Sequence, residues 1–324
     1  MNGTAEGKTT MFSVEHLTKS LGGREILHDI SFEAYAGEVF GLLGPNGAGK
    51  TTTIKIAVGM LMLDEGTIRI GGHDLRHEYE AAIASLGGIV ENPEFYKYMS
   101  GWDNLLQNAR IRRNKINEDR IREVVSLVGL GNRIHDKVGK YSLGMRQRLG
   151  VAQAILGDPK VLILDEPTNG LDPAGIKELR DIFKKLAHEF GCAVIVSSHL
   201  MSEMEMMCDR VGVIVNGCLQ CVSTTAELLS ATAADKCDFI LRTSDAAAAR
   251  AALDFLDETD RKLTEDGNLE LVLPKEGADA MIARVNRAVI SAGIELYTVS
   301  PKENKRLEDV FIQMTGSEGG AQIA

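Results

Sequence analysis

Apolar and polar residues alternate along two stretches near the start of the chain, residues 12–20 and 25–36. A period of two residues is typical of strands that bury one face. A third stretch, GTIRI at 66–70, has the same pattern and ends at a Gly-Gly pair. These three segments predict an antiparallel sheet in the first part of the chain.

Two later runs, VLIL at 161–164 and AVIV at 193–196, are apolar at every position. Such runs are typical of strands buried on both faces of a parallel sheet. A charge-rich stretch at about 174–190 predicts a helix between them and hence a right-handed βαβ unit. Helical periodicity dominates residues 93–158. The pattern therefore predicts an α/β fold with a helical insert.

After residue 222 the chain becomes small and polar (STTAELLSATAADK), which predicts a linker at 223–236. The pattern beyond it predicts a domain at 237–316 with the order βαββαβ, which suggests a small ferredoxin-like α+β fold. A flexible tail is expected at 317–324. The expected elements are strands 238–243, 260–264, 268–273 and 294–299, and helices 246–257, 276–292 and 304–315.

The composition of the 324-residue chain, 44% hydrophobic and 25% charged, is that of an ordinary globular protein. No run approaches the ~20 apolar residues that cross a bilayer, and the first residues lack the apolar core of a secretory signal. Any membrane role is therefore expected through a partner chain. The net charge of −10 weighs against a nucleic-acid partner.

The five cysteines follow no disulfide framework, which indicates reduced cytosolic thiols. Cys218 and Cys221 form a C-x-x-C motif, but no second pair or histidine lies nearby in the sequence. The motif also falls within a predicted strand hairpin. We therefore expect neither a metal nor a redox role for it.

The segment GPNGAGKT at 44–51 matches the phosphate-binding pattern GxxxxGK[ST]. A short strand at 38–43 is expected before it and a helix at 52–62 after it, which would turn backbone N–H groups toward a polyphosphate. Lys50 would reach the β- and γ-phosphates, and the Thr51 hydroxyl would bind Mg²⁺. The sequence therefore predicts a nucleotide site. Its residues are Gly44, Pro45, Asn46, Gly47, Ala48, Gly49, Lys50, Thr51 and Thr52.

Two carboxyl groups end the apolar run at 161–164. Asp165 would hold Mg²⁺, and Glu166 would orient and deprotonate the attacking water. His199 follows the next apolar run and could reach the γ-phosphate, although a capping or core role is the more common one for a lone histidine. Upstream, a helix opens at YSLGMRQR, where a serine and a glycine can present N–H groups to a phosphate or simply cap the helix. The residues concerned are Ser142, Leu143, Gly144 and Met145.

Together these segments resemble the ATP-binding subunits of ABC transporters over about residues 11–222. The resemblance assigns Walker A to 44–51, Walker B to 161–166, the signature to 142–147 and the D-loop, which includes Asp172, to 168–172. His199 matches the switch histidine. The resemblance implies an ATPase that uses ATP and Mg²⁺.

The same resemblance implies partners. Two copies are expected to pack head to tail around two ATP molecules, each ATP lying between the Walker motifs of one copy and the segment 142–145 of the other. Closure would then drive a separate transmembrane permease. The chain is accordingly expected in the cytoplasm, held at the inner face of the cell membrane only through that permease.

The chain departs from the common family pattern at two places. Glu91 stands where most members have a glutamine that touches Mg²⁺ and the permease, so Glu91 is a candidate metal ligand that tunes coupling to the permease. A neutral replacement that the site tolerates is the alternative. Leu21 stands where an aromatic residue commonly stacks on adenine, so selection of ATP over GTP is expected to be loose. Phe95, Tyr96 and Tyr98 are candidate docking residues. The basic stretch at 109–115 is interpreted as a solvated face, with a docking patch for the permease or a contact with anionic lipid as the alternative.

Glu91, Leu143 and the phrase LEDVF at 307–311 look like the bacitracin- and lantibiotic-resistance branch, an ABC-2-type exporter group. The expected function is therefore ATP-driven export of a peptide antibiotic or drug. A soluble ABC-type ATPase of translation or DNA repair is one alternative, although those chains usually carry two cassettes or a long insert. A regulatory subunit without turnover is the other, and the presence of Glu166 and His199 weighs against it.

Overall fold

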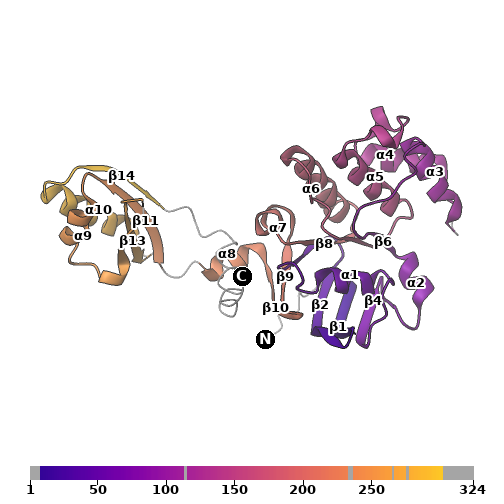
Figure 1. Cartoon of the computed structure of the whole chain (residues 1–324), viewed down its shortest axis with the longest axis horizontal. Helices are drawn as coiled ribbons and strands as arrows, with labels where there is room; N and C mark the ends of the chain where they lie inside the picture. Colours follow the sequence, from indigo (N-terminus) through magenta and orange to yellow (C-terminus); the bar gives the residue numbers. More distant parts are fainter. Residues whose placement is uncertain (1–7, 113–114, 233–235, 265, 275–276, 302–324) are drawn as a thin grey trace. The chain divides into compact units, whose positions relative to one another are not determined.

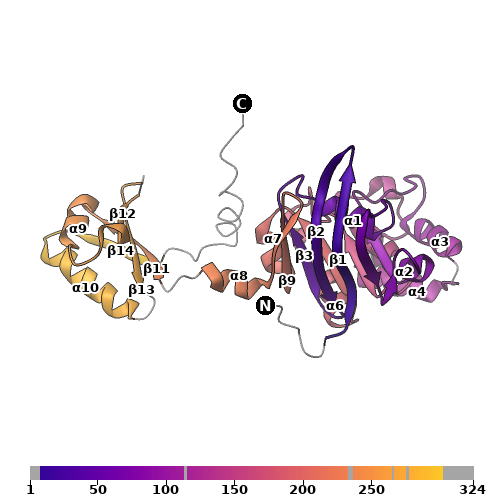
Figure 2. The same ribbon diagram turned by 90° about the horizontal axis from the view of Figure 1, so that it is seen from below.

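The structure is a computed structural model that describes residues 8–112, 115–232, 236–264, 266–274 and 277–301. The chain divides into two compact units, Met1–Thr225 and Ala226–Ala324, and each is described by itself (Figure 1 and Figure 2). The helix expected at 304–315, the LEDVF phrase and the tail at 317–324 lie outside the described residues. No helix in the described part of the chain is both long and apolar enough to cross a membrane.

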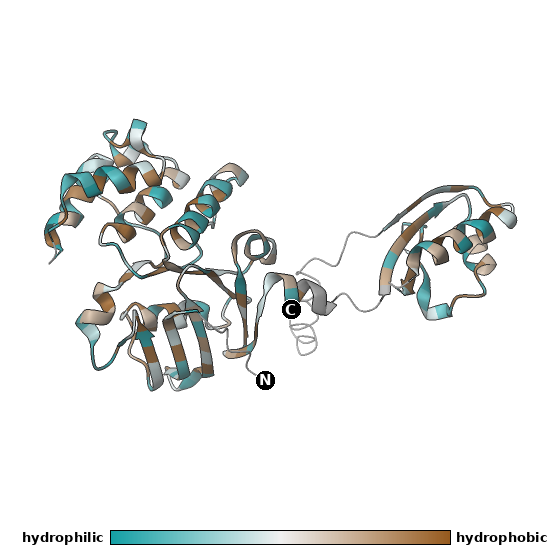
Figure 3. Cartoon of the chain, turned by 180° about the vertical axis from the view of Figure 1, so that it is seen from behind, coloured by the Kyte–Doolittle hydropathy of each residue, from teal (hydrophilic) through white to brown (hydrophobic). Residues whose placement is uncertain are grey.

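A four-stranded sheet of order β2-β1-β4-β5 begins the first unit, with antiparallel pairing throughout. Hydrophobic and hydrophilic bands alternate along its strands, as the period of two residues predicted (Figure 3). The apolar positions pack into the core of this unit, which includes Phe12, Ile30 and Ile68. The strands are β1 (Thr10–Leu21), β2 (Arg24–Tyr35), β4 (Glu65–Ile70) and β5 (His73–Asp74).

A six-stranded sheet of order β10-β9-β3-β8-β7-β6 forms the centre of this unit. Every neighbouring pair is parallel except β10 with β9. Strands β3, β7 and β8 are buried at every position, as their continuous apolar runs predicted. The strands are β3 (Val39–Leu43), β6 (Leu86–Ile89), β7 (Val161–Leu164), β8 (Ala193–Ser198), β9 (Arg210–Val215) and β10 (Cys218–Thr224).

The order of this sheet positions the site. Strand β8 lies between β3 and β7, and the carboxyl ends of parallel strands meet at one edge of a sheet. Leu43 pairs with Ser198, and Leu164 pairs with Val196. The loops that follow β3, β7 and β8 are therefore neighbours although they lie far apart in the sequence.

Helix α1 (Lys50–Ala57) is shorter than the helix expected at 52–62. Gly59 adopts a φ of 77° one residue after the C-cap Val58, and a glycine in this left-handed conformation commonly ends a helix. The expected helix at 174–190 is present as α6 (Pro173–His188). The remaining helices around the central sheet are α2 (Tyr79–Ala84) and α7 (Met201–Met207).

The insert is helical, as its periodicity predicted. The side chains of Ser100, Asn117 and Ser142 cap its three helices by accepting a backbone N–H bond from the first turn. The elements are α3 (Gly101–Ile111), α4 (Glu118–Leu127) and α5 (Leu143–Ile155), with short 3₁₀ turns η1 (Gly131–Arg133) and η2 (Val138–Lys140).

The second unit has the order βαββαβ and a fully antiparallel sheet of order β12-β13-β11-β14. This arrangement is the ferredoxin-like fold that the sequence predicted. Its core is a separate apolar cluster that includes Leu241, Leu271 and Val285. The elements are β11 (Lys236–Thr243), α9 (Ala246–Ala252), η3 (Glu258–Asp260), β12 (Arg261–Leu263), β13 (Leu269–Pro274), α10 (Ala278–Ser291) and β14 (Leu296–Pro301). The segment expected as a linker at 223–236 contains helix α8 (Thr225–Thr232).

Candidate nucleotide-binding site

The phosphate-binding loop leaves the buried strand β3 and enters α1, as predicted. A Cβ at Gly44 would collide with the backbone oxygen of Ile214, and one at Gly49 would lie 2.5 Å from Leu27 Cδ2. Gly49 also has a φ of 108°, a conformation that only glycine adopts readily. The loop is therefore confined between β2 and β9. Its glycines let it turn there and present the N-terminal end of α1, where unpaired N–H groups attract phosphate.

Lys50 lies inside the loop. Its ammonium group donates to the backbone oxygens of Gly44 (2.7 Å) and Pro45 (3.3 Å) and lies 3.6 Å from Glu166 Oε1. Only 5% of the side chain is exposed. Burial lowers the pKa of Lys50, and the nearby Glu166 carboxylate opposes that shift. The charge is thus held with little water around it, where its attraction for a phosphate is strongest.

Thr51, at the start of α1, and Asp165, just after β7, lie close together, and their shared role as metal ligands stays a prediction. Thr51 Oγ1 donates to Asp165 Oδ1 at 3.3 Å. A hydroxyl and a carboxylate are oxygen donors of the kind that Mg²⁺ prefers, and Mg²⁺ commonly takes one or two carboxylates together with substrate phosphates.

Ser197 on β8 contacts two of the predicted site residues, although the sequence pattern did not indicate it as a site residue. Its hydroxyl donates to Asp165 Oδ1 at 2.6 Å and accepts the Glu166 backbone N–H at 2.9 Å. The side chain is completely buried. Two serines at the end of an otherwise apolar strand were the available signal, since buried hydroxyls need partners.

Glu166 and His199 are side by side. His199 Nδ1 lies 2.9 Å from Glu166 Oε2, while the other oxygen of Glu166 faces Lys50. Glu166 also has a φ of 48°. A glutamate in the left-handed region costs conformational energy, and such residues are concentrated at functional sites. His199 is 34% exposed and so is not a core histidine, and its role at the γ-phosphate stays a prediction.

Glu91 has a different neighbour from the one expected. Its carboxylate accepts a 2.8 Å hydrogen bond from Lys55 Nζ on α1, and 69% of its side chain is exposed. This bond holds the pKa of Glu91 below its usual value. The structure therefore pairs Glu91 with Lys55 rather than with Thr51 and Asp165, and a role for Glu91 as a direct metal ligand stays a prediction.

The signature segment lies beside the D-loop of its own chain. A Cβ at Gly170 would lie 3.2 Å from Leu143 Cδ2, and one at Gly144 would lie 3.9 Å from Leu171. Ser142 accepts the Met145 N–H at 3.2 Å, so capping is its role in the single chain. Asp172 caps α6 by accepting the Gly175 N–H at 3.1 Å. Among the contacts of the described residues, none joins 142–145 to the phosphate-binding loop.

Leu21 ends β1 with 41% of its surface exposed, and its contact with the base stays a prediction. Cys218 and Cys221 lie on β10 in the predicted hairpin with β9. In the described ranges, no group of three or more His, Cys, Asp or Glu side chains is arranged to hold a metal ion.

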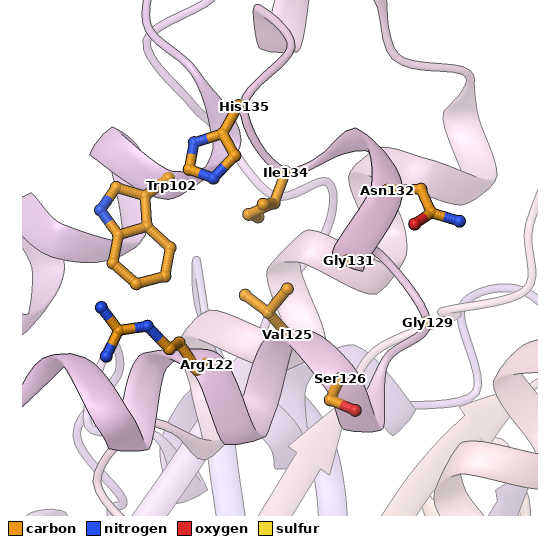
Figure 4. Close-up of a pocket in the computed structure, with 9 residues that line it drawn as sticks. All are labelled: Trp102, Arg122, Val125, Ser126, Gly129, Gly131, Asn132, Ile134 and His135. Atoms are coloured by element: carbon orange, nitrogen blue, oxygen red, sulfur yellow. The ribbon is translucent and has the colours of Figure 1, made fainter.

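A cleft of about 530 Å³ lies on the helical insert and contains none of the residues above. The Arg122 guanidinium lies 5.6 Å from the centre of the Trp102 ring, and His135 lies 5.8 Å from it (Figure 4). This cleft is therefore separate from the nucleotide site. Its lining is Trp102, Arg122, Val125, Ser126, Gly129, Gly131, Asn132, Ile134 and His135.

Comparison with known proteins agrees with this geometry. A family model described as "ABC transporter" matches residues 27–169. The chain is 48% identical to the ABC transporter ATP-binding protein YhcH of Bacillus subtilis, over 95% of this chain and 96% of that one. It is 35% identical to the bacitracin transport ATP-binding protein BcrA of Bacillus licheniformis, over 95% and 98%. A solved structure of the ATP-binding subunit of an ABC transporter aligns with a TM-score of 0.61 and 27% identity, over 69% of this chain and 94% of that one. Because the two curated relatives, at 48% and 35% identity, each match over 95% of this chain, the protein belongs to the ATP-binding subunits of ABC transporters, which are ATPases.

Proposed function

We propose that this chain hydrolyses ATP to drive export of a peptide antibiotic or similar toxin through a separate membrane permease. The observation that carries the ATPase part is the meeting of Lys50, Asp165, Glu166 and His199 at one edge of the central sheet. The export part rests on relatives named for bacitracin transport, lantibiotic transport and linearmycin resistance. Similarity to transport subunits over 95% of the chain does not favour the translation or DNA-repair alternative.

In this proposal Glu166 accepts the proton of the attacking water. Its carboxylate is in place between Lys50 and His199, and a positioned general base contributes typically 10²–10⁴-fold to a rate. Lys50 exchanges its bonds to the loop carbonyls for bonds to the phosphates. His199 uses one ring nitrogen for Glu166, which leaves the other for the γ-phosphate. Thr51 and Asp165 would hold the Mg²⁺ that accompanies ATP, and that ion would neutralise phosphate charge.

A second copy of the chain completes the site in this proposal. The signature segment 142–145 lies beside its own D-loop, and among the described residues no contact joins it to its own phosphate-binding loop. It is therefore free to contribute N–H groups to an ATP held by another copy. Asp172 caps α6 next to that surface and would lie at the junction of the two copies. Closure would exclude water and strengthen the electrostatic interactions inside.

The permease is proposed to dock beside Glu91. Tyr96 and Tyr98 are exposed, and the centres of their rings lie 5.9 Å apart. Exposed aromatic residues are enriched at protein interfaces. We place the chain at the cytoplasmic face of the membrane, held there only by this contact.

Glu91 is proposed to tune coupling through Lys55. Mg²⁺ or a permease group near Glu91 would compete with the Lys55 ammonium for the carboxylate, whereas a neutral glutamine would hold that ammonium less strongly. If so, replacing Lys55 by Met should change the Mg²⁺ dependence of ATP hydrolysis in the natural chain but not in a Glu91→Gln chain. Equal effects in both backgrounds would contradict this coupling.

The ATPase proposal is tested with Glu166→Gln and Glu189→Gln. Glu189 is an exposed residue just after α6 and serves as the matched control. Glu166→Gln should lower ATP hydrolysis by roughly 10²–10⁴-fold and produce a dimer with trapped Mg-ATP on size exclusion, whereas Glu189→Gln should do neither. Full turnover by Glu166→Gln, or an unchanged rate after Ser142→Arg, would contradict the shared site.

The export proposal is tested in living cells that carry the gene. Loss of the gene should raise sensitivity to bacitracin, to a lantibiotic or to a linearmycin-type compound. The natural chain and Glu189→Gln should restore resistance, and Glu166→Gln should not. Unchanged sensitivity to all three classes would contradict the proposed substrates but leave the ATPase proposal standing.

A further inference from the structure

A second buried polar network lies behind the site and is centred on Glu203 in α7. Only 7% of Glu203 is exposed. Its Oε2 atom accepts hydrogen bonds from Thr168 Oγ1 at 2.6 Å and from Ser198 Oγ at 3.0 Å. Thr168 and Ser198 are themselves buried. A buried carboxyl group is costly unless it is hydrogen-bonded, so these partners hold it in one place.

The two donors belong to the two segments that carry the catalytic groups. Thr168 begins the D-loop and is separated from Glu166 only by Pro167. Ser198 ends β8 and directly precedes His199, and its hydroxyl also accepts the Leu200 N–H at 3.0 Å. One carboxylate oxygen of Glu203 therefore holds both the segment that follows Glu166 and the segment that precedes His199.

The paired serines of β8 explain how the two networks divide. Successive side chains of a strand point to opposite faces. Ser197 bonds Asp165 and the Glu166 backbone, and Ser198 bonds Glu203 on the other side. The network of Ser197 fixes Asp165, the carboxylate proposed to bind Mg²⁺. The second is the one that links the D-loop to the His199 segment.

We propose that Glu203 is a positioning residue for ATP hydrolysis. It holds the D-loop and His199 as one unit, so that a displacement of the D-loop by a second copy is transmitted to the contact between Glu166 and His199. This inference rests on the proposed ATPase function and adds to it a residue that does not touch the nucleotide.

The test compares Glu203→Leu, Glu203→Gln and Thr168→Val in the full-length chain, with Glu205→Gln as control. Glu205 lies on the same helix and is exposed. Glu203→Leu and Thr168→Val should each lower kcat by about 10- to 100-fold, the size of effect that small misplacements produce, with KM for Mg-ATP changed less than about twofold. Glu203→Gln keeps an acceptor oxygen and should retain most of kcat. Glu205→Gln should match the natural chain.

Two readouts separate positioning from a general loss of structure. The double variant Thr168→Val/Glu203→Leu should be no slower than the slower single variant, because both remove the same link. Binding of a fluorescent ATP analogue should be unchanged. Additive losses, weakened nucleotide binding in parallel with kcat, or equal losses in Glu203→Gln and Glu203→Leu would overturn the proposal.

If Glu203→Leu does not fold, Thr168→Val and Ser198→Ala carry the same comparison from the donor side. Natural kcat in both variants would overturn the proposal, and reduced kcat at unchanged KM would support it. A natural chain without ATPase activity would instead refute the proposed function.

Discussion

Replacing Ser197 by Ala removes one hydroxyl that forms hydrogen bonds with two candidate site residues, Asp165 and Glu166. Its hydrogen bond to Asp165 is 2.6 Å long, and the Glu166 N–H donates to it at 2.9 Å. Ser197 is fully buried and Asp165 is 4% exposed. The change removes little volume, so the cost comes from polar groups that lose their partners.

The two losses can be estimated separately. A hydrogen bond to a charged group contributes about 1.5–3 kcal/mol, and a buried N–H left without a partner costs about 1–3 kcal/mol. Thr51 still donates to Asp165 at 3.3 Å, so the carboxylate keeps one partner and the first loss is reduced. We therefore expect the free energy of unfolding to fall by about 2–4 kcal/mol.

The assay is urea denaturation followed by tryptophan fluorescence. The chain has a single tryptophan, Trp102, in the first unit, so the signal reports that unit even though a two-unit chain need not unfold in one step. Ser20→Ala, at an exposed strand position, is the control and should change stability by less than about 0.5 kcal/mol. A change below about 0.5 kcal/mol in Ser197→Ala as well would refute the reasoning.

Three further predictions follow from other contacts. Gly150→Ala places a Cβ 2.9 Å from Pro93, and this overpacking should lower the free energy of unfolding in urea by about 1–3 kcal/mol. An unchanged midpoint would contradict it. Burial raises the pKa of Glu38, so the folded state binds the proton more tightly and stability is lost as pH rises from the usual glutamate range through the raised pKa. Glu38→Gln should flatten this slope, and parallel curves of midpoint against pH would count against it. Leu21→Tyr should lower KM for ATP about fivefold or more, because the tyrosine ring can stack on the base. KM is measured for both ATP and GTP, and unchanged values would argue against a base at that position.

Much of the fold was predictable from local patterns. Alternation located β1, β2 and β4, and uninterrupted apolar runs located β7 and β8, because these periods follow from the strand itself and its burial. The βαββαβ order of the second unit was predictable for the same reason. The length of α1 was not, because a glycine within an apolar run need not end a helix, and Gly59 does so here.

Some residues of the candidate site were predictable from the sequence and others were not. Residues 44–51 and the pair Asp165–Glu166 were identifiable because their spacing encodes the chemistry within one short segment. Ser197, Lys55 and Glu203 were not, because each acts through a partner far away in the sequence.

The chain thus carries its chemistry in local motifs, and these alone indicated a phosphate-binding loop and two carboxyl groups with separate roles. The sheet order β9-β3-β8-β7 decided which motifs meet. It places the end of β8 between the phosphate-binding loop and the Asp165–Glu166 segment, so that Ser197 reaches Asp165 while Ser198 reaches Glu203. Side chains on a strand alternate in direction, but which neighbours they find depends on the packing of strands that are distant in sequence.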